Sequence, residues 1–209
     1  RSNELKHWKD LYQGVPASSG STTQQSSIPV TAEYPFDSSR IMQIDNTYIV
    51  VAFNDGFMLV HQQNAHEQLL YEEFKSAQEG VAIASQRILF PVTMELSAAD
   101  SILLTEWLPD LNRLGYIVET FGKNSFVIQG VPAGVKEGNE KAILENALEQ
   151  YKHFSSDIKI TAIEKLYRSL SRQQAIKAGT ILSKEEMVQL VSGLFAAGLP
   201  AAKIGRAHV

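Results

Sequence analysis

Apolar residues in this chain gather in short runs from about residue 40 onward. Runs of β-branched and aromatic residues are typical of strands, and both Asn54-Asp55-Gly56 and Gly122-Lys123-Asn124 are hairpin turn signals between two such runs. The sequence therefore predicts two hairpins. The strands predicted in this way are 41–44, 48–53, 57–61, 116–121 and 125–131, with a short β-rich run at 86–91.

Other apolar residues repeat at helical spacing. Ser97 with Asp100, and Ser183 with Glu186, have the pattern of a helix start, and Gly179 suits the position just after a helix end. The predicted helices are 65–75, one from Ser97 with the apolar stripe Leu104, Trp107, Leu108 and Leu111, one around 144–151, a long one over 160–178, and a last one carrying Met187, Leu190, Val191, Leu194 and Phe195. Helices and hairpins are mixed without a βαβ repeat, so the predicted fold class is α+β.

Composition narrows the class of protein. With 209 residues, 44% of them hydrophobic, the chain is long enough for one or two compact domains. It has no cysteine, which excludes disulfides and cysteine-ligated metal sites and fits a reducing compartment. A sequence pI of about 5.8 gives no strong general attraction for DNA. No apolar run approaches the roughly 20 residues that a membrane span needs.

The first 34 residues differ from the rest. Residues 17–28 are rich in Ser, Thr and Gln and predict a linker, while Leu5, Trp8 and Leu11 have the spacing of a short amphipathic segment. The polar start at Arg1 lacks the apolar core of a signal peptide and indicates the start of a fragment.

The run from His61 to Glu72 follows an apolar strand and opens a helix. We expect His61 and Gln63 at the strand end, and His66 and Glu67 in the first helical turn. Such a junction can gather metal ligands or a catalytic acid. The simpler interpretation is that polar residues cap and solvate a helix N-terminus, and the residues alone favour it.

This run resembles a segment of the C-terminal dimerisation domain of MutL-type mismatch-repair proteins, which reads L-I-D-Q-H-A-A-H-E-R-I-L-Y-E. Three further blocks resemble that family in the same order. They are residues 121–127 with Val131-Pro132-Ala133, residues 174–179 with 182–187, and Gly205-Arg206. Four ordered blocks make an unrelated α+β binding domain the weakest alternative.

The resemblance implies a two-lobed fold. One lobe, residues 35–86 and 166–209, is a dimerisation subdomain with a small mixed sheet and helices. The other, residues 87–165, is an inserted regulatory subdomain, and residues 1–34 are a linker or N-terminal extension. The implied partners are a second copy of the chain, the replicative sliding clamp and a MutS-type mismatch-recognition protein. The implied location is the cytoplasm, at the nucleoid during repair, with no membrane contact.

Nuclease-active members of this family gather one or two divalent metals with D-Q-H-A-x-x-E-x-x-x-x-E, an A-C block and C-P-H. This chain lacks five of these residues: the Asp and first His of the first motif, the Cys of the second, and the Cys and His of the third. The replacing residues are His61, Gln63, Arg172, Ala202 and Ile204, and the retained ones are Glu67 and Glu72. We therefore expect no metal site, no cofactor and no nicking activity, with His61, Glu67 and Glu72 as the remnant of the site.

The alternative is a divergent endonuclease with a shifted metal site. It would use His61, His66, Glu67 and Glu72, because histidine and carboxylates are both capable ligands.

Two further patterns suggest partners. Gln86-Arg87-Ile88-Leu89-Phe90-Pro91 resembles the clamp-binding motif Q-x-x-[L/I]-x-P of the family, with Gln86, Leu89 and Pro91 as the contacts; otherwise it is an ordinary edge strand that Pro91 ends. Lys165, Arg168 and Arg172 share one helix face. That face is either a weak contact to DNA phosphates or, as the acidic chain favours, a solvated basic surface.

Overall fold

The computed structural model describes residues 36–53, 56–136, 138–154, 160–198 and, for the backbone alone, 205–208. The segment Leu5–Leu11, the linker 17–28, the turn residues Asn54 and Asp55, and Ala202 and Ile204 lie outside the described residues. The helices are α1 Gln62–Glu79, α2 Ala98–Arg113, α3 Glu140–Lys152, α4 Ala162–Gln174 and α5 Lys184–Ala196, and a 3₁₀ turn spans Ser38–Arg40. The strands are β1 Ile41–Ile44, β2 Tyr48–Phe53, β3 Gly56–His61, β4 Ser85–Glu95, β5 Ile117–Thr120, β6 Ser125–Pro132 and β7 Gly205–His208.

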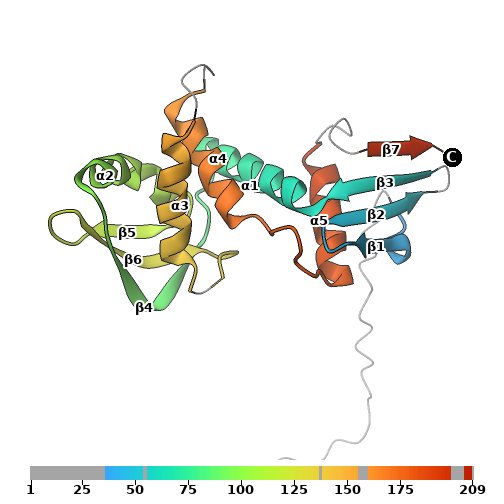
Figure 1. Cartoon of the computed structure of the whole chain (residues 1–209), viewed down its shortest axis with the longest axis horizontal. Helices are drawn as coiled ribbons and strands as arrows, with labels where there is room; N and C mark the ends of the chain where they lie inside the picture. Colours follow the sequence, from blue (N-terminus) through green and yellow to red (C-terminus); the bar gives the residue numbers. More distant parts are fainter. Residues whose placement is uncertain (1–35, 54–55, 137, 155–159, 199–204, 209) are drawn as a thin grey trace, which may run out of the picture. The chain divides into compact units, whose positions relative to one another are not determined.

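The first sheet has the order β1-β2-β3-β7, and every pairing in it is antiparallel. One face is covered by α5, as Figure 1 shows. Alternation along each strand turns one set of apolar side chains toward α5. The core between them contains Ile41, Ile49, Val51, Met58 and Val60 from the strands and Met187, Val188, Leu190, Val191 and Leu194 from α5.

The second sheet has the order β4-β6-β5 and is also antiparallel. Helices α2, α3 and α4 and the later turns of α1 supply the rest of its core (Figure 1). The fully buried members of this core include Phe74, Met94, Leu104, Leu111, Tyr116, Phe126, Ile128, Leu144, Leu166 and Leu170.

Helix α1 belongs to both cores. Ala65, in its first turn, packs in the first core, and Phe74 and Ala77 pack in the second. The chain returns from the second core to the first through α4, the segment 175–183 and α5. Two connections, α1 and the segment 175–183, thus join the two parts, and their mutual contacts form the site described below.

The predicted α+β class, both hairpins and all five helices are confirmed. Trp107 is buried, as its position on an apolar stripe predicts. Ser97 caps α2, and Ser183 with Glu186 forms a complete capping box. Thr161 and Glu164 form a second complete capping box at the start of α4.

Several predicted details were wrong. The helix over 160–178 ends at Gln174, because Ala175 turns to an extended conformation and Gly179 lies in a separate turn with φ of 88°. Helix α1 is longer than 65–75 at both ends, so Gln63 lies in the first helical turn and not at a strand end. The sheet expected to be mixed is antiparallel. Strand β7 was not predicted, since four residues without an apolar alternation give no signal.

The division into a dimerisation and a regulatory subdomain at residues 86/87 and 165/166 stays a prediction. Among the described helices, none is both long and apolar enough to cross a membrane.

Candidate functional site

The start of α1 is capped by His61. Strand β3 ends there, and His61 keeps an extended backbone while its ring nitrogen Nδ1 accepts a hydrogen bond from the backbone N–H of Asn64 at 3.3 Å. The ring also packs edge-on against Tyr48, with ring centroids 5.3 Å apart. A helix start leaves unpaired N–H groups, and His61 satisfies one of them.

Gln62 is fully buried and forms the centre of a hydrogen-bond network. Its side-chain amide donates to the carbonyls of Asn46, Lys177 and Thr180 at 2.8, 3.0 and 3.0 Å. Its carbonyl accepts from Gln43 at 2.6 Å. Gln43 in turn donates to the carbonyl of Thr180 and accepts from the N–H of Leu182. Sequence reasoning missed both glutamines, although Gln62 stands in the most informative run of the chain.

The next polar residues of α1 bind the same returning segment. Gln63 accepts from the N–H of Ala178 at 3.2 Å, and Nδ1 of His66 accepts from the N–H of Ile176 at 2.9 Å. Burial lowers the pKa of His66 below its ordinary value of 6.5, so the ring is neutral at pH 7. The first turns of α1 therefore hold the segment 176–180 through side chains that satisfy its backbone groups.

This geometry bears on metal binding. A histidine that binds a metal through Nε2 normally donates the proton on Nδ1 to a nearby acceptor. In His61 and His66, Nδ1 is instead turned toward a backbone N–H, which can only donate. Metal ligation through Nε2 would place two protons against each other at Nδ1 and break these hydrogen bonds.

The two carboxylates of the remnant lie on the same helix. Glu72 accepts a hydrogen bond from Gln68 at 3.0 Å, and the charge of Glu67 acts on Lys177. Burial lowers the pKa of Lys177, and Glu67 partly opposes that effect. Within the described residues, which include His61, His66, Glu67 and Glu72, no three side chains of the ligand-forming types lie together as a metal site requires.

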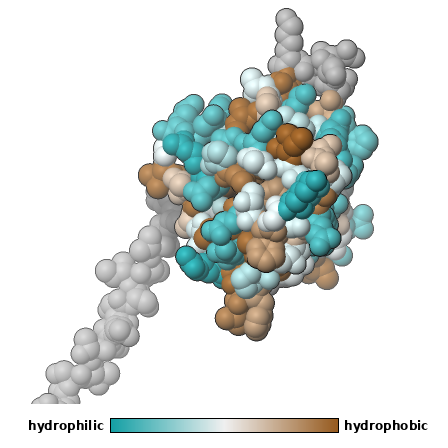
Figure 2. Space-filling view, turned by 90° about the vertical axis from the view of Figure 1, so that its left-hand side faces the viewer, coloured by the Kyte–Doolittle hydropathy of each residue, from teal (hydrophilic) through white to brown (hydrophobic). Residues whose placement is uncertain are grey.

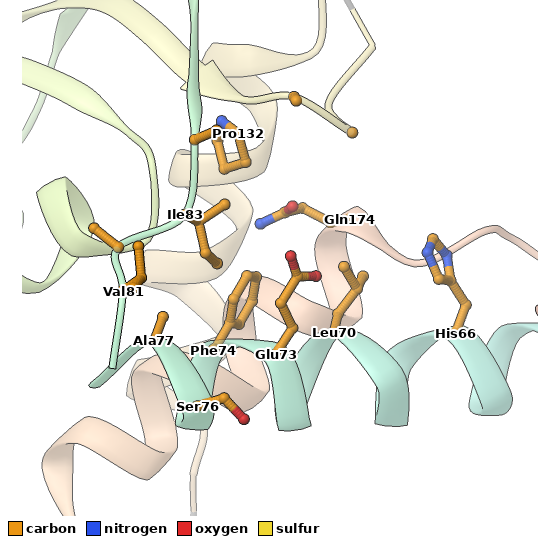
Figure 3. A pocket seen from close by; sticks show the side chains of 14 residues that line it. His66, Leu70, Glu73, Phe74, Ser76, Ala77, Val81, Ile83, Pro132 and Gln174 are labelled. Carbon is orange, nitrogen blue, oxygen red and sulfur yellow. The ribbon is translucent and has the colours of Figure 1, made fainter. Parts of the chain in front are cut away.

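The later turns of α1 line an apolar pocket of about 610 Å³, which Figure 3 shows in close-up. A second pocket of about 400 Å³ adjoins it, and both pockets share His66, Gly134 and Gln174 as lining residues. No sequence signal pointed to either pocket, because their walls come from α1, the chain before β4, the end of β6, helix α3, the end of α4 and the segment after it.

The predicted clamp motif lies on β4, an edge strand. Arg87 pairs with Gly130 and Val92 with Ile128, so four residues of β4 stand opposite the single Gln129. This bulge pushes Leu89 and Phe90 outward, and they are 82% and 78% exposed. Figure 2 shows a hydrophobic projection at the lower end of this face, where β4 bends in Figure 1. Gln86 and Pro91 are exposed as well, and the strand continues through Pro91 to Glu95, so the expectation that Pro91 ends it was wrong.

The predicted basic residues lie on α4. The ammonium of Lys165 is 6.0 Å from the ring centre of Tyr151, and the guanidinium of Arg168 is 5.0 Å from that of Tyr71. Arg172 is exposed at the last turn. Two of the three cations thus have aromatic partners within the chain, and the weak contact to DNA phosphates stays a prediction.

The outer face of the first sheet, opposite α5, is apolar and open. Met42 and Ile44 of β1 are 58% and 48% exposed, and Tyr48 and Phe57 are 37% exposed each. Val50 and Leu59 lie between them and are half-buried. Monomeric proteins rarely expose a continuous patch of this kind.

Comparison with known proteins agrees with these features. Residues 41–182 match the family model described as the MutL C-terminal dimerisation domain. The chain is 37% identical over 161 residues to the DNA mismatch repair protein MutL of Chlorobium phaeobacteroides, which covers 77% of this chain and 26% of that protein. It is 30% identical over 204 residues to the protein of the same name from Flavobacterium psychrophilum, and this match covers 94% of this chain and 33% of that protein.

The chain therefore belongs to the family of MutL C-terminal dimerisation domains. It spans about a quarter to a third of the length of these curated relatives.

Proposed function

We propose that this chain is the homodimerisation and partner-docking domain of a mismatch-repair protein, and that it has no endonuclease activity. The observation that carries the dimerisation surface is the outer face of the first sheet, defined by Met42, Ile44, Tyr48 and Phe57. The family to which the chain belongs is a dimerisation domain, and an exposed apolar sheet face is a suitable surface for a second copy. In a homodimer with twofold symmetry the same face of each copy would contact the other.

Sedimentation analysis tests this surface. We expect a dimer at micromolar concentration for the natural chain and a monomer for the double variant Met42→Asp/Ile44→Asp, because two carboxylates would be buried without partners. Ile102→Asp is the matched control, since Ile102 is 65% exposed on α2, away from the sheet. A natural chain that stays monomeric, or a double variant that stays dimeric, would contradict the proposal.

The absence of nicking is supported by the roles of the replaced residues. His61 caps α1 and Gln63 binds Ala178, so both positions serve the fold. The alternative function is a divergent metal-dependent endonuclease. Calorimetric titration with Mn²⁺ and Zn²⁺, together with a nicking assay on supercoiled DNA, separates the two. We expect neither micromolar binding nor nicking, and finding both would establish the alternative.

Docking to the sliding clamp is the second part of the proposal, and the bulge of β4 favours it. A clamp-binding peptide must present apolar side chains to a groove from an extended backbone. Leu89 and Phe90 are exposed on such a backbone at the edge of the sheet. The variant Gln86→Ala/Leu89→Ala/Pro91→Ala should lose clamp binding in a pull-down assay, whereas Thr93→Ala/Glu95→Ala, further along the same strand, should retain it. Equal binding of the triple variant and the natural chain would refute the clamp contact.

The remaining partners follow by analogy with the family. We propose that the full protein also contacts a MutS-type mismatch-recognition protein and acts in the cytoplasm, at the nucleoid during repair. DNA contact through Lys165, Arg168 and Arg172 would be weak and sensitive to salt.

A further inference from the structure

The larger pocket has an unusual combination of walls. Leu70, Phe74 and Ala77 of α1 form its floor, and Ile83 and Pro132 face them from the opposite side, as Figure 3 shows. Its volume of about 610 Å³ lies within the range of pockets that hold small ligands or peptide side chains. Its walls contain no lysine or arginine and only one acidic residue, Glu73.

The Glu73 carboxylate points from α1 into this pocket, toward Gln174 (Figure 3). Among the described residues no hydrogen bond or ion pair reaches it. Burial raises the pKa of Glu73 above its ordinary value of 4.5, and no cation opposes that effect. The side chain is nevertheless exposed at the pocket mouth, where its carboxylate stands beside apolar walls. A group of this kind is stabilised by a ligand that brings a positive charge.

A second acceptor lies beside it. The Gln174 side chain lines the same pocket, and its amide nitrogen donates to the hydroxyl of Tyr116 at 2.9 Å, which leaves its carbonyl oxygen without a hydrogen bond among the described residues. Two neighbouring acceptors in an apolar pocket match a planar guanidinium, which carries five N–H donors and loses less hydration than an ammonium when it is buried.

The rim of the pocket favours a peptide as the occupant. The chain from Val81 to Ala84 runs along it outside any helix or strand, and Val81 is 91% exposed. In this stretch only the N–H of Ile83 donates to another backbone group of the described chain, the carbonyl of Arg113 at 2.9 Å. The stretch continues directly into β4, so an extended peptide alongside it would find free backbone groups and apolar side chains together.

We propose that this pocket binds an extended segment of a partner protein in which an arginine stands between apolar residues. The guanidinium lies against Glu73 and the Gln174 carbonyl, and the flanking apolar side chains lie on Leu70 and Ile83. This inference rests on the proposed partner-docking role, but it requires neither the dimer surface nor the β4 bulge.

Fluorescence anisotropy with a labelled, blocked pentapeptide Leu-Val-Arg-Val-Leu tests the proposal on the full chain. We expect saturable binding that weakens about tenfold or more when the arginine is replaced by citrulline, its neutral isostere, because a charge-assisted hydrogen bond is lost. The variant Glu73→Gln should bind the arginine peptide more weakly by the same factor, and its affinity for the citrulline peptide should equal that of the natural chain. Glu79→Gln, an exposed carboxylate on the same helix outside the pocket, is the matched control and should bind like the natural chain.

The location of the peptide has its own test. On addition of the peptide, amide shifts in two-dimensional NMR spectra should change for residues 70–84 and 132–134. The variant Gly134→Leu should block binding. A Cβ at Gly134 meets no atom within 4 Å, so the new side chain can fill the pocket without strain. Thermal unfolding verifies that each variant is folded. Equal affinity for the arginine and citrulline peptides, unchanged affinity in Glu73→Gln, or shifts elsewhere would overturn the proposal. Sedimentation of the same samples reports on dimerisation separately, so the two failures are distinguishable.

Discussion

The two halves of α1 treat their polar side chains in opposite ways. In the first turns Gln62, Gln63 and His66 all bind the segment 175–180, and His61 caps the helix. Three turns later Glu73 faces a pocket without a partner. The paired polar groups of the first turns stabilise one structure, whereas the Glu73 side chain is exposed and has no partner among the described residues. The comparison teaches that the run most like a catalytic motif serves the fold, and that the binding candidate lies where the chain leaves a charge unsatisfied.

Removing the centre of the paired half should have the largest effect. Gln62→Ala is expected to lower the free energy of unfolding by about 2–3 kcal/mol, because a buried network loses its main donor. The loss stays below the sum of the single bonds, since the carbonyls of Asn46 and Thr180 each retain a second donor. Urea unfolding measures this loss. The control is Gln78→Ala, on the exposed side of the same helix, whose free energy of unfolding should lie within about 0.5 kcal/mol of that of the natural chain. Equal stability of the two variants would contradict the role of the network.

His66 gives a smaller effect that depends on pH. His66→Leu should cost about 1–2 kcal/mol at pH 8, because the N–H of Ile176 loses its acceptor. The folded-state pKa is lowered, so the stabilising contribution is present above 6.5 and is lost as the pH falls through the folded pKa. His66→Asn offers an acceptor that does not titrate in this range. From pH 8 to pH 5 the free energy of unfolding should therefore fall more steeply for the natural chain than for His66→Asn. An equal pH dependence of the two proteins would refute the assignment.

The cap on α1 should contribute about 1 kcal/mol, the usual value for a helix N-cap. His61→Ala removes it, whereas His61→Asp supplies a strong cap of the usual kind. We expect the alanine variant to be less stable than the natural chain and the aspartate variant at least as stable, by thermal unfolding. A loss of stability in the aspartate variant would indicate that packing of the ring on Tyr48 is more important than capping.

The smallest effect is expected at the unpaired end, and its sign is opposite. Glu73→Gln should leave stability unchanged or raise it by less than about 0.5 kcal/mol at pH 7, because the carboxylate is exposed and partial burial disfavours its charge only mildly. The folded-state pKa of Glu73 is raised, so its contribution to stability is present below 4.5 and is lost as the pH rises through the folded pKa. The difference between natural chain and variant should therefore widen from pH 4 to pH 7. A clear loss of stability in Glu73→Gln would show that the carboxylate has a partner after all.

The local elements follow from the sequence alone. Alternating apolar residues and turn signals define both hairpins, and Ser97 and Ser183 mark helix starts, because these patterns depend only on neighbours along the chain. The family could also be recognised from four ordered blocks. The end of α4 could not be predicted, because Ala175, Ile176 and Ala178 are compatible with a helix. In the structure the N–H groups of Ile176 and Ala178 are bound by His66 and Gln63 instead.

The tertiary structure decided what each polar residue does. The sequence presents His61, Gln62, Gln63 and His66 as one motif. In the structure His61 caps α1, while the other three bind the returning segment 176–180. Glu73 is one of several acidic residues on α1 when the sequence is considered alone. Its place at the mouth of an apolar pocket comes from Ile83, Pro132 and Gln174, which lie 10 to 101 positions further along the chain. Contacts between distant segments set burial and pairing, and a sequence pattern carries information only about near neighbours.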